Sequence, residues 1–175
     1  TVLVDKNAYL GGTGTAGLVT HFDPINIIEA TGIASEIYEN LKAQGGIKEF
    51  FVDPLKITKA NIGVKFWEAG CGFDVEIYKT VTRNMLERAN VELLFHSMVI
   101  DVVMESTQIK GIVIHGKSKD IILYANTIID CTGDGDIAAL AGAAFEVGDE
   151  SGEIMAPTLC FEVAGVDERS LDEYL

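Results

Sequence analysis

Residues 98–125 read MVIDVVMESTQIKGIVIHGKSKDIILYA. Three runs rich in valine and isoleucine, at residues 98–105, 109–115 and 120–125, are separated by the short polar stretches STQ and GKSK. Apolar runs joined by short polar turns are typical of consecutive antiparallel strands. The sequence therefore predicts a three-stranded antiparallel meander over this stretch.

Two stretches before the meander have the periodicity of amphipathic helices. The first covers residues 31–43 and is followed by Gly45 and Gly46, which predict a C-cap. The second covers residues 75–89 and is preceded by Asp74, a residue type that commonly caps helix N-termini. The predicted inward faces are Ile33, Ile37 and Leu41 in the first helix, and Val75, Tyr78, Val81 and Met85 in the second.

Further short apolar runs predict strands at residues 1–5, 91–95, 127–131 and 158–166. Residues 47–73 have a mixed pattern, for which we expect a lid-like excursion with a strand or two. A short helix is expected at residues 136–140, and another begins at residue 167. This order predicts an α/β fold in which a parallel sheet carries an inserted antiparallel meander.

The amino-acid composition excludes some classes of binding partner. Of 175 residues, 48% are hydrophobic and 23% charged, which is typical of a globular chain. Lys and Arg number 13 against 27 Asp and Glu, so the net charge is −14. A chain this acidic repels polyanions, so neither nucleic acid nor an anionic membrane is an expected partner.

No apolar run approaches the roughly 20 residues of a membrane span, and the opening TVLVD does not resemble a signal peptide. The cysteines Cys71, Cys131 and Cys160 are odd in number and form no CxxC pair. This spacing indicates neither a zinc or iron–sulfur site nor a disulfide framework, so no metal is expected. We expect a cytoplasmic protein.

Two features near the N-terminus could contact a nucleotide. Asp5 ends the first predicted strand, where a carboxylate can accept hydrogen bonds from ribose hydroxyls or simply lie at the surface. The stretch LGGTGTAG at residues 10–17 lacks the lysine of a Walker loop. Clustered glycines allow close backbone approach to a ligand, although they also form ordinary turns.

The stretch IIDCTGDGDIAALAG at residues 128–142 places glycines and aspartates where a predicted strand passes into a helix. The segment Asp134–Asp136 resembles the start of a calcium loop, but the apolar residues that follow exclude that motif. An acid–base pair of Asp134 and Asp136 would lack a nearby nucleophile or histidine. A sugar or ribityl ligand and simple N-capping by Asp136 both remain open.

Together these stretches resemble the FAD-dependent oxidoreductase family, in the branch built like the succinate dehydrogenase/fumarate reductase flavoprotein subunit. The resemblance rests on the order of an acid-tipped strand, a GGT-type loop and a late TGDGD motif. It implies a partial Rossmann-like FAD-binding domain over residues 1–152 and the start of a substrate domain over residues 153–175. Cys131 stands where the family usually has alanine, which exchanges one small residue for another.

The resemblance also implies roles for individual residues. Asp5 would hold the adenosine ribose, the loop would pass the pyrophosphate and the flavin side, and the strand at Val99 would pair with the adenine edge. The TGDGD motif would close over the middle of the cofactor. The cofactor-binding residues implied in this way are Asp5, Lys6, Gly11, Gly12, Thr13, Val99, Thr132, Gly133, Asp134, Gly135 and Asp136.

The family's GxGxxG fingerprint is missing from this sequence. We therefore expect an internal fragment of a larger flavoenzyme that transfers hydride between FAD and a small substrate, and expect the fragment itself to bind FAD weakly or not at all. No catalytic residue can be named. A non-catalytic nucleotide-binding or interaction domain is the alternative, and homo-oligomerisation is left open; the meander disfavours a nicotinamide dehydrogenase.

Overall fold

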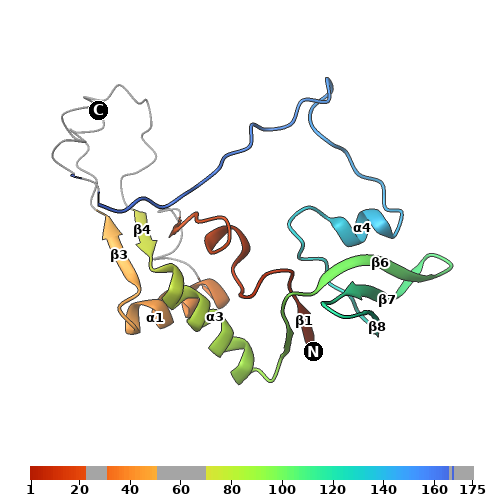
Figure 1. Ribbon diagram of the computed structural model, residues 1–175, viewed down its shortest axis with the longest axis horizontal. Helices are drawn as coiled ribbons and strands as arrows, with labels where there is room; N and C mark the ends of the chain where they lie inside the picture. The colour runs from red at the N-terminus through yellow and green to blue at the C-terminus, as the bar shows by residue number, and fades with distance from the viewer. Residues whose placement is uncertain (23–30, 51–69, 166, 168–175) are drawn as a thin grey trace. The chain divides into compact units, whose positions relative to one another are not determined.

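The computed structural model describes residues 1–22, 31–50, 70–165 and 167 (Figure 1). The chain divides into two compact units. The first, called the meander unit, comprises Thr1–Tyr9 and Asn90–Thr158. The second, called the glycine-loop unit, comprises Leu10–Ala89 and Leu159–Leu175. Each unit is described by itself.

The meander unit contains a parallel pair of strands. β1 (Val2–Val4) pairs with β5 (Glu92–Leu94), with Val2 opposite Glu92 and Val4 opposite Leu94. The N–H of Asp5 continues this ladder by donating to the carbonyl of Leu94 at 2.9 Å. The parallel strands predicted from the apolar runs at residues 1–5 and 91–95 are therefore confirmed.

The predicted meander is also confirmed. β6 (Met98–Glu105), β7 (Gln108–His115) and β8 (Asp120–Tyr124) form an antiparallel sheet in the order β6-β7-β8. Ile114 on the central strand is fully buried. The short helix α4 (Asp136–Leu140) contacts β6, with Ile137 as its buried residue (Figure 1). The α/β class predicted from the sequence is thus correct.

The glycine-loop unit contains two helices and a second antiparallel sheet. α1 (Ile33–Ala43) and α3 (Val75–Arg88) confirm the two predicted helices. β2 (His21–Phe22), β4 (Gly70–Phe73) and β3 (Ile47–Phe50) pair in the order β2-β4-β3. The strands expected within residues 47–73 are therefore present at both ends of that stretch, and residues 51–69 lie outside the described part of the chain.

The core of this unit lies where the helices meet β4. Leu41, Phe73 and Val81 are its buried members. Two residues predicted for the inward faces of the helices lie outside this core. Ile33, in the first turn of α1, is 71% exposed. Val75 is only half-buried and does not belong to the core cluster. Residues that pack against the buried members are Phe22, Ile37, Ile47, Ile77, Tyr78 and Met85.

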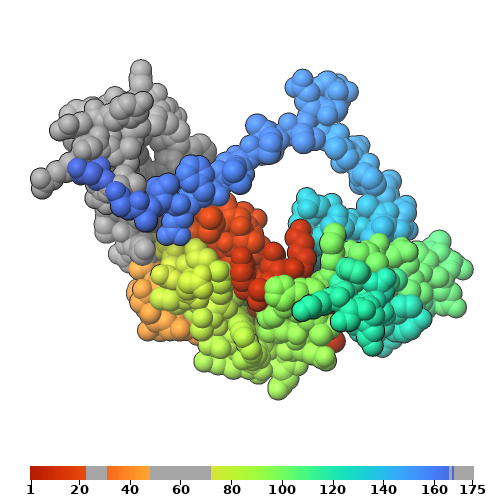
Figure 2. Space-filling model, in the orientation of Figure 1, coloured from red at the N-terminus to blue at the C-terminus, as the bar shows by residue number. Residues whose placement is uncertain are grey.

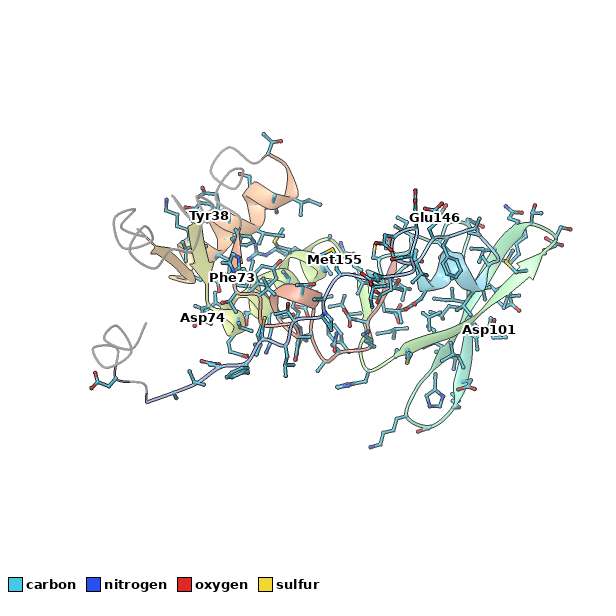
Figure 3. The ribbon with its side chains drawn as sticks, turned by 90° about the horizontal axis from the view of Figure 1, so that it is seen from above. Tyr38, Phe73, Asp74, Asp101, Glu146 and Met155 are labelled. Carbon is cyan, nitrogen blue, oxygen red and sulfur yellow. The ribbon has the colours of Figure 1, made fainter. Side chains whose placement is uncertain are left out.

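Both predicted helix caps are observed. The carboxylate of Asp74 accepts from the N–H groups of Glu76 at 2.9 Å and Ile77 at 3.0 Å, directly after β4 passes into α3 (Figure 3). At the end of α1, Gly45 adopts a left-handed φ of 70°. The N–H of Gly46 donates to Leu41 at 2.8 Å, as in a Schellman motif.

Asp74→Ala is expected to lower the free energy of unfolding by about 1 kcal/mol, because two N–H groups of α3 lose their acceptor. Asp74→Ser is the matched control, since serine also caps helices and should restore most of the loss. Urea denaturation followed by circular dichroism measures both variants. Equal destabilisation by the two substitutions would contradict the capping role.

Two predicted strands are absent from the described residues. Residues 127–131 and 158–165 have no strand pairing, and Ile129 is 78% exposed. Both runs are apolar, but a strand needs a neighbour for its N–H and C=O groups, and none in the described ranges lies alongside. Residues 143–165 are coloured blue in Figure 2. The helix expected from residue 167 lies outside the described residues after its first position.

Among the helices of the described residues, none combines the length and apolar character needed to cross a bilayer.

Candidate functional site

The glycine loop begins with a tight left-handed turn at Gly11, where φ is 106°. A Cβ atom at this position would lie 2.7 Å from Cγ2 of Thr15 and 2.8 Å from Cε1 of Tyr78. Thr15 is 1% exposed, and its hydroxyl donates to the carbonyl of Leu10 at 2.7 Å. The side of the loop that faces the unit's interior therefore has room only for glycine.

The opposite side of the loop is open. Residues Gly12–Gly14 form a short 3-10 helix, η1. Nothing lies within 4 Å of a Cβ placed on Gly12, whose φ is 46°. Gly11, Gly12 and Thr13 are all exposed. The three residues implied by the family resemblance are therefore brought together on one accessible turn.

Asp5 lies directly after β1 in the meander unit. Its Oδ1 accepts from the N–H of Asn7 at 2.8 Å, and its carbonyl accepts from Ser97 at 3.1 Å. Within the described residues, Oδ2 of Asp5 has no hydrogen-bond partner. The structure thus leaves one carboxylate oxygen available directly after β1. Lys6, beside it, is exposed.

Val99 lies near the start of β6, two residues after Ser97. It pairs with Ile114 of β7 and is half-buried. The hydrogen bond from Ser97 to Asp5 therefore ties the start of β6 to the end of β1. Asp5 and the strand that carries Val99 therefore belong to one local arrangement.

The aspartate that organises the late motif is Asp130, which the sequence analysis did not single out. Its Oδ1 accepts from the N–H and the hydroxyl of Thr132 at 3.0 and 2.8 Å. Its Oδ2 accepts from the N–H groups of Ile137 and Ala138, both at 3.0 Å. One carboxylate thus holds the turn and the start of α4 together.

Thr132 completes the capping of α4. Its hydroxyl oxygen accepts from the N–H of Asp136 at 3.0 Å and, more weakly, from that of Asp134 at 3.4 Å. The first N–H groups of α4 are therefore already occupied by Asp130 and Thr132. The N-cap residue is Gly135, which makes no side-chain capping bond. The interpretation of Asp136 as the N-cap is wrong, because Asp130 and Thr132 accept the hydrogen bonds from these N–H groups.

Asp134 and Asp136 are left outside this network. Both are exposed, and within the described ranges neither carboxylate accepts a hydrogen bond. Gly133 and Gly135 have φ values of 89° and 71°, with nothing within 4 Å of a Cβ at either. The two glycines therefore present Asp134 on an open, left-handed turn where its carboxylate can reach a ligand.

The hydrogen bonds to Asp130 also act on its acidity. Its pKa lies below the ordinary aspartate value, first because the N–H of Thr132 donates to it. Partial burial opposes this shift, and the Thr132 hydroxyl and the N–H groups of Ala138 and Ile137 reinforce it. The ionised form is thus the one that the folded turn holds.

We expect the Asp130 carboxyl to titrate below about 3.9, the value of an unperturbed aspartate. Because the folded-state pKa is lowered, the stability it contributes is present above the unfolded value and is lost as the pH falls through the folded one. Carboxyl chemical shifts followed by NMR from pH 7 to pH 2 measure this. A midpoint at or above 3.9 would contradict the bonding, and Thr132→Val should raise the midpoint.

In the part of the chain that the structure describes, no three His, Cys, Asp or Glu side chains gather as metal ligands would. Cys131 is an exposed free thiol and Cys160 a half-buried one. Around the start of α4, the carboxylates of Asp134 and Asp136 are exposed and accept no hydrogen bond from the described residues. Carboxylate oxygens are acceptors, so they suit a ligand rich in hydroxyl groups.

Solved structures similar to this chain include two with low sequence identity. Among solved structures it is similar to THI4 of Thermovibrio ammonificans, with 13% identity, a TM-score of 0.48, and coverage of 79% of this chain and 50% of that one. It is also similar to the L-amino acid deaminase of Proteus myxofaciens, solved with anthranilate, with 14% identity, a TM-score of 0.27, and coverage of 59% and 26%. This chain thus spans about half the length of THI4.

Among curated proteins, none matches the sequence. The family model described as FAD dependent oxidoreductase matches residues 1–175, which is the whole chain. This chain therefore belongs to the FAD dependent oxidoreductase family.

Proposed function

We propose that this chain forms part of the FAD site of an oxidoreductase that transfers hydride between FAD and a small substrate. The proposal rests on the different surroundings of Asp130 and Asp134. Both carboxylate oxygens of Asp130 accept hydrogen bonds from the protein itself. Asp134 lies between two glycines with left-handed φ, is exposed, and has no hydrogen-bond partner for its carboxylate in the described residues. A free carboxylate on such a turn suits the hydroxyls of a ribityl chain or ribose.

The remaining residues fit FAD in the same way. The free oxygen of Asp5 suits ribose hydroxyls, since a carboxylate oxygen accepts from them. The open turn at Gly12 and Thr13 lets the chain come close to phosphate or ring oxygens. When bound, FAD supplies hydride acceptance and donation, and the protein supplies binding and orientation.

We further propose the branch of the family, the domain bounds and the partner. The succinate dehydrogenase/fumarate reductase branch is favoured by the order of the motifs. Residues 1–152 would form the FAD-binding part and residues 153–175 the start of a substrate domain. The expected partner is a small-molecule substrate. These assignments rest on the resemblance of the motifs.

The test is a visible spectrum of the purified full-length gene product. A flavin absorbance band in 1:1 ratio to protein, bleached by a chemical reductant, is the expected result. Persistent absence of flavin would contradict the proposal and favour the alternative, a non-catalytic nucleotide-binding or interaction domain. For residues 1–175 alone we expect weak FAD binding or none, so stoichiometric flavin on that chain would contradict this second expectation.

A further inference from the structure

β8 forms one edge of the antiparallel sheet, since the strand order is β6-β7-β8 (Figure 1). Directly after β8, the N–H of Ala125 donates to the carbonyl of Lys110 at 3.1 Å. In an antiparallel pair, every second residue exchanges hydrogen bonds with the neighbouring strand. Counting back from Ala125, Leu123 and Ile121 bond β7, and the residues that alternate with them do not.

The N–H and C=O groups of Asp120, Ile122 and Tyr124 therefore point away from β7. Within the described residues, none of these backbone groups has a hydrogen-bond partner. Their side chains are exposed as well, with 48% exposure for Ile122 and 70% for Tyr124. β8 thus presents a row of unpaired donors and acceptors along a mainly apolar strand.

Proteins commonly protect an edge strand with a bulge, a proline, a lysine within the strand or a covering element. The opposite edge strand, β6, has register shifts at Val99/Asp101 and Val103/Met104, and it contacts α4. β8 has no register shift and contains no proline or lysine. In the part of the chain that the structure describes, it pairs with β7 alone. β8 is therefore open to pairing with a further strand.

A second copy of β8 fits this edge in the antiparallel direction. The outward residues are symmetric about Ile122, so a twofold axis beside Ile122 gives each of them a partner. Asp120 then pairs with Tyr124 of the partner subunit, and Ile122 pairs with Ile122 of the partner subunit. Two β-branched side chains meet at the axis, which is a favourable cross-strand pair. Twofold homodimers are also the commonest oligomers.

The charges around β8 favour the same arrangement. Lys119 and Asp120 lie at the start of the strand, and Ala125 follows its end. Antiparallel pairing places the charged end of one copy beside the neutral end of the other, whereas parallel pairing would place like charges together. The net charge of −14 does not oppose this, because Asp120 is the single acid between residues 108 and 126. Its Oδ1 lies 2.6 Å from Nδ1 of His115.

We propose that the full-length protein forms a twofold-symmetric dimer in which the β8 strands of two copies pair antiparallel. The two meanders then form one continuous sheet in the order β6-β7-β8-β8-β7-β6. The interaction surface is the open edge of β8, and its partner is a second copy of this chain. The inference is independent of the proposed function, because this edge contains none of the residues proposed to bind FAD.

The test is the molar mass of the full-length protein across a dilution series, measured by sedimentation velocity. We expect a mass of two chains at high concentration and of one chain on dilution. Ile122→Lys places two lysines beside each other at the twofold axis, so it should raise the dissociation constant of the dimer roughly 10-fold or more. Met98→Lys is the matched control, since Met98 is 55% exposed but lies on β6, away from the pairing edge. This variant should dimerise as the unmodified protein does.

Ile122→Cys provides a second test. On mild oxidation it should form a disulfide between the two copies, because residues opposite each other in antiparallel strands lie about 5.5 Å apart. Mass spectrometry of the linked peptides identifies the position, and the unmodified protein controls for the native cysteines. A full-length protein that is monomeric at every concentration would overturn the inference. So would a dimer that Ile122→Lys leaves intact, equal weakening by Met98→Lys, or a dimeric Ile122→Cys variant without the linked peptide.

Discussion

Gly11→Ala is expected to lower the free energy of unfolding by roughly 2–5 kcal/mol. The φ of 106° at Gly11 is unfavourable for any residue with a Cβ. The added methyl group would also lie 2.7 Å from Cγ2 and 2.9 Å from Oγ1 of Thr15. Thr15 cannot yield easily, because it is buried and its hydroxyl already donates to Leu10.

Gly12→Ala is the matched control for this effect. Its φ of 46° is also left-handed, but nothing lies within 4 Å of the added Cβ. We therefore expect a loss of about 1 kcal/mol from backbone strain alone. Guanidinium denaturation followed by circular dichroism measures both variants. Equal losses at the two positions would show that packing against Thr15 and Tyr78 is not what requires glycine at position 11.

The elements that the sequence predicted correctly are those stabilised by local contacts. β6, β7 and β8 are consecutive strands joined by short turns, so their pairing follows from valine and isoleucine runs and turn residues. The helices α1 and α3 were recognisable because an apolar face and a cap occur together in each. In such cases the residues that decide the structure are close in sequence.

The sheet β2-β4-β3 could be predicted only in part. β2 has two residues, and β4 reads GCGF, a stretch poor in strand-forming side chains. Its pairing depends on partners far apart in the chain, with Phe22 opposite Cys71. Conversely, residues 127–131 are apolar enough for a strand but have no partner among the described residues. Apolar character predicted neither pairing nor burial for this stretch, since Ile129 is 78% exposed.

For the candidate site, the sequence indicated the segment at residues 128–142 but could not assign roles to its aspartates. Asp130, Asp134 and Asp136 are chemically identical, and only the fold of the turn decides which one meets N–H groups. The available signal was Thr132, two residues after Asp130, a spacing typical of an aspartate that bonds the backbone ahead of it. That spacing distinguishes Asp130, which bonds the backbone, from the exposed Asp134 and Asp136.

Asp130→Ala is expected to lower the free energy of unfolding by roughly 1–3 kcal/mol. The substitution leaves the N–H groups of Ile137 and Ala138 without an acceptor and removes the acceptor for Thr132. It also removes a negative charge at the start of α4, where the helix dipole favours one. Because the turn that presents Asp134 would lose its order, FAD binding should weaken as well.

Asp134→Ala is expected to separate binding from folding. Its carboxylate has no partner in the described residues, so the free energy of unfolding should change by no more than about 0.5 kcal/mol. FAD binding by the full-length protein should nevertheless weaken roughly 10-fold or more, as expected for the loss of a charged hydrogen bond. Denaturation of the apoprotein and FAD titration measure the two effects independently. If Asp134→Ala destabilised the fold as much as Asp130→Ala while leaving FAD affinity intact, the assignment of the two aspartates would be reversed.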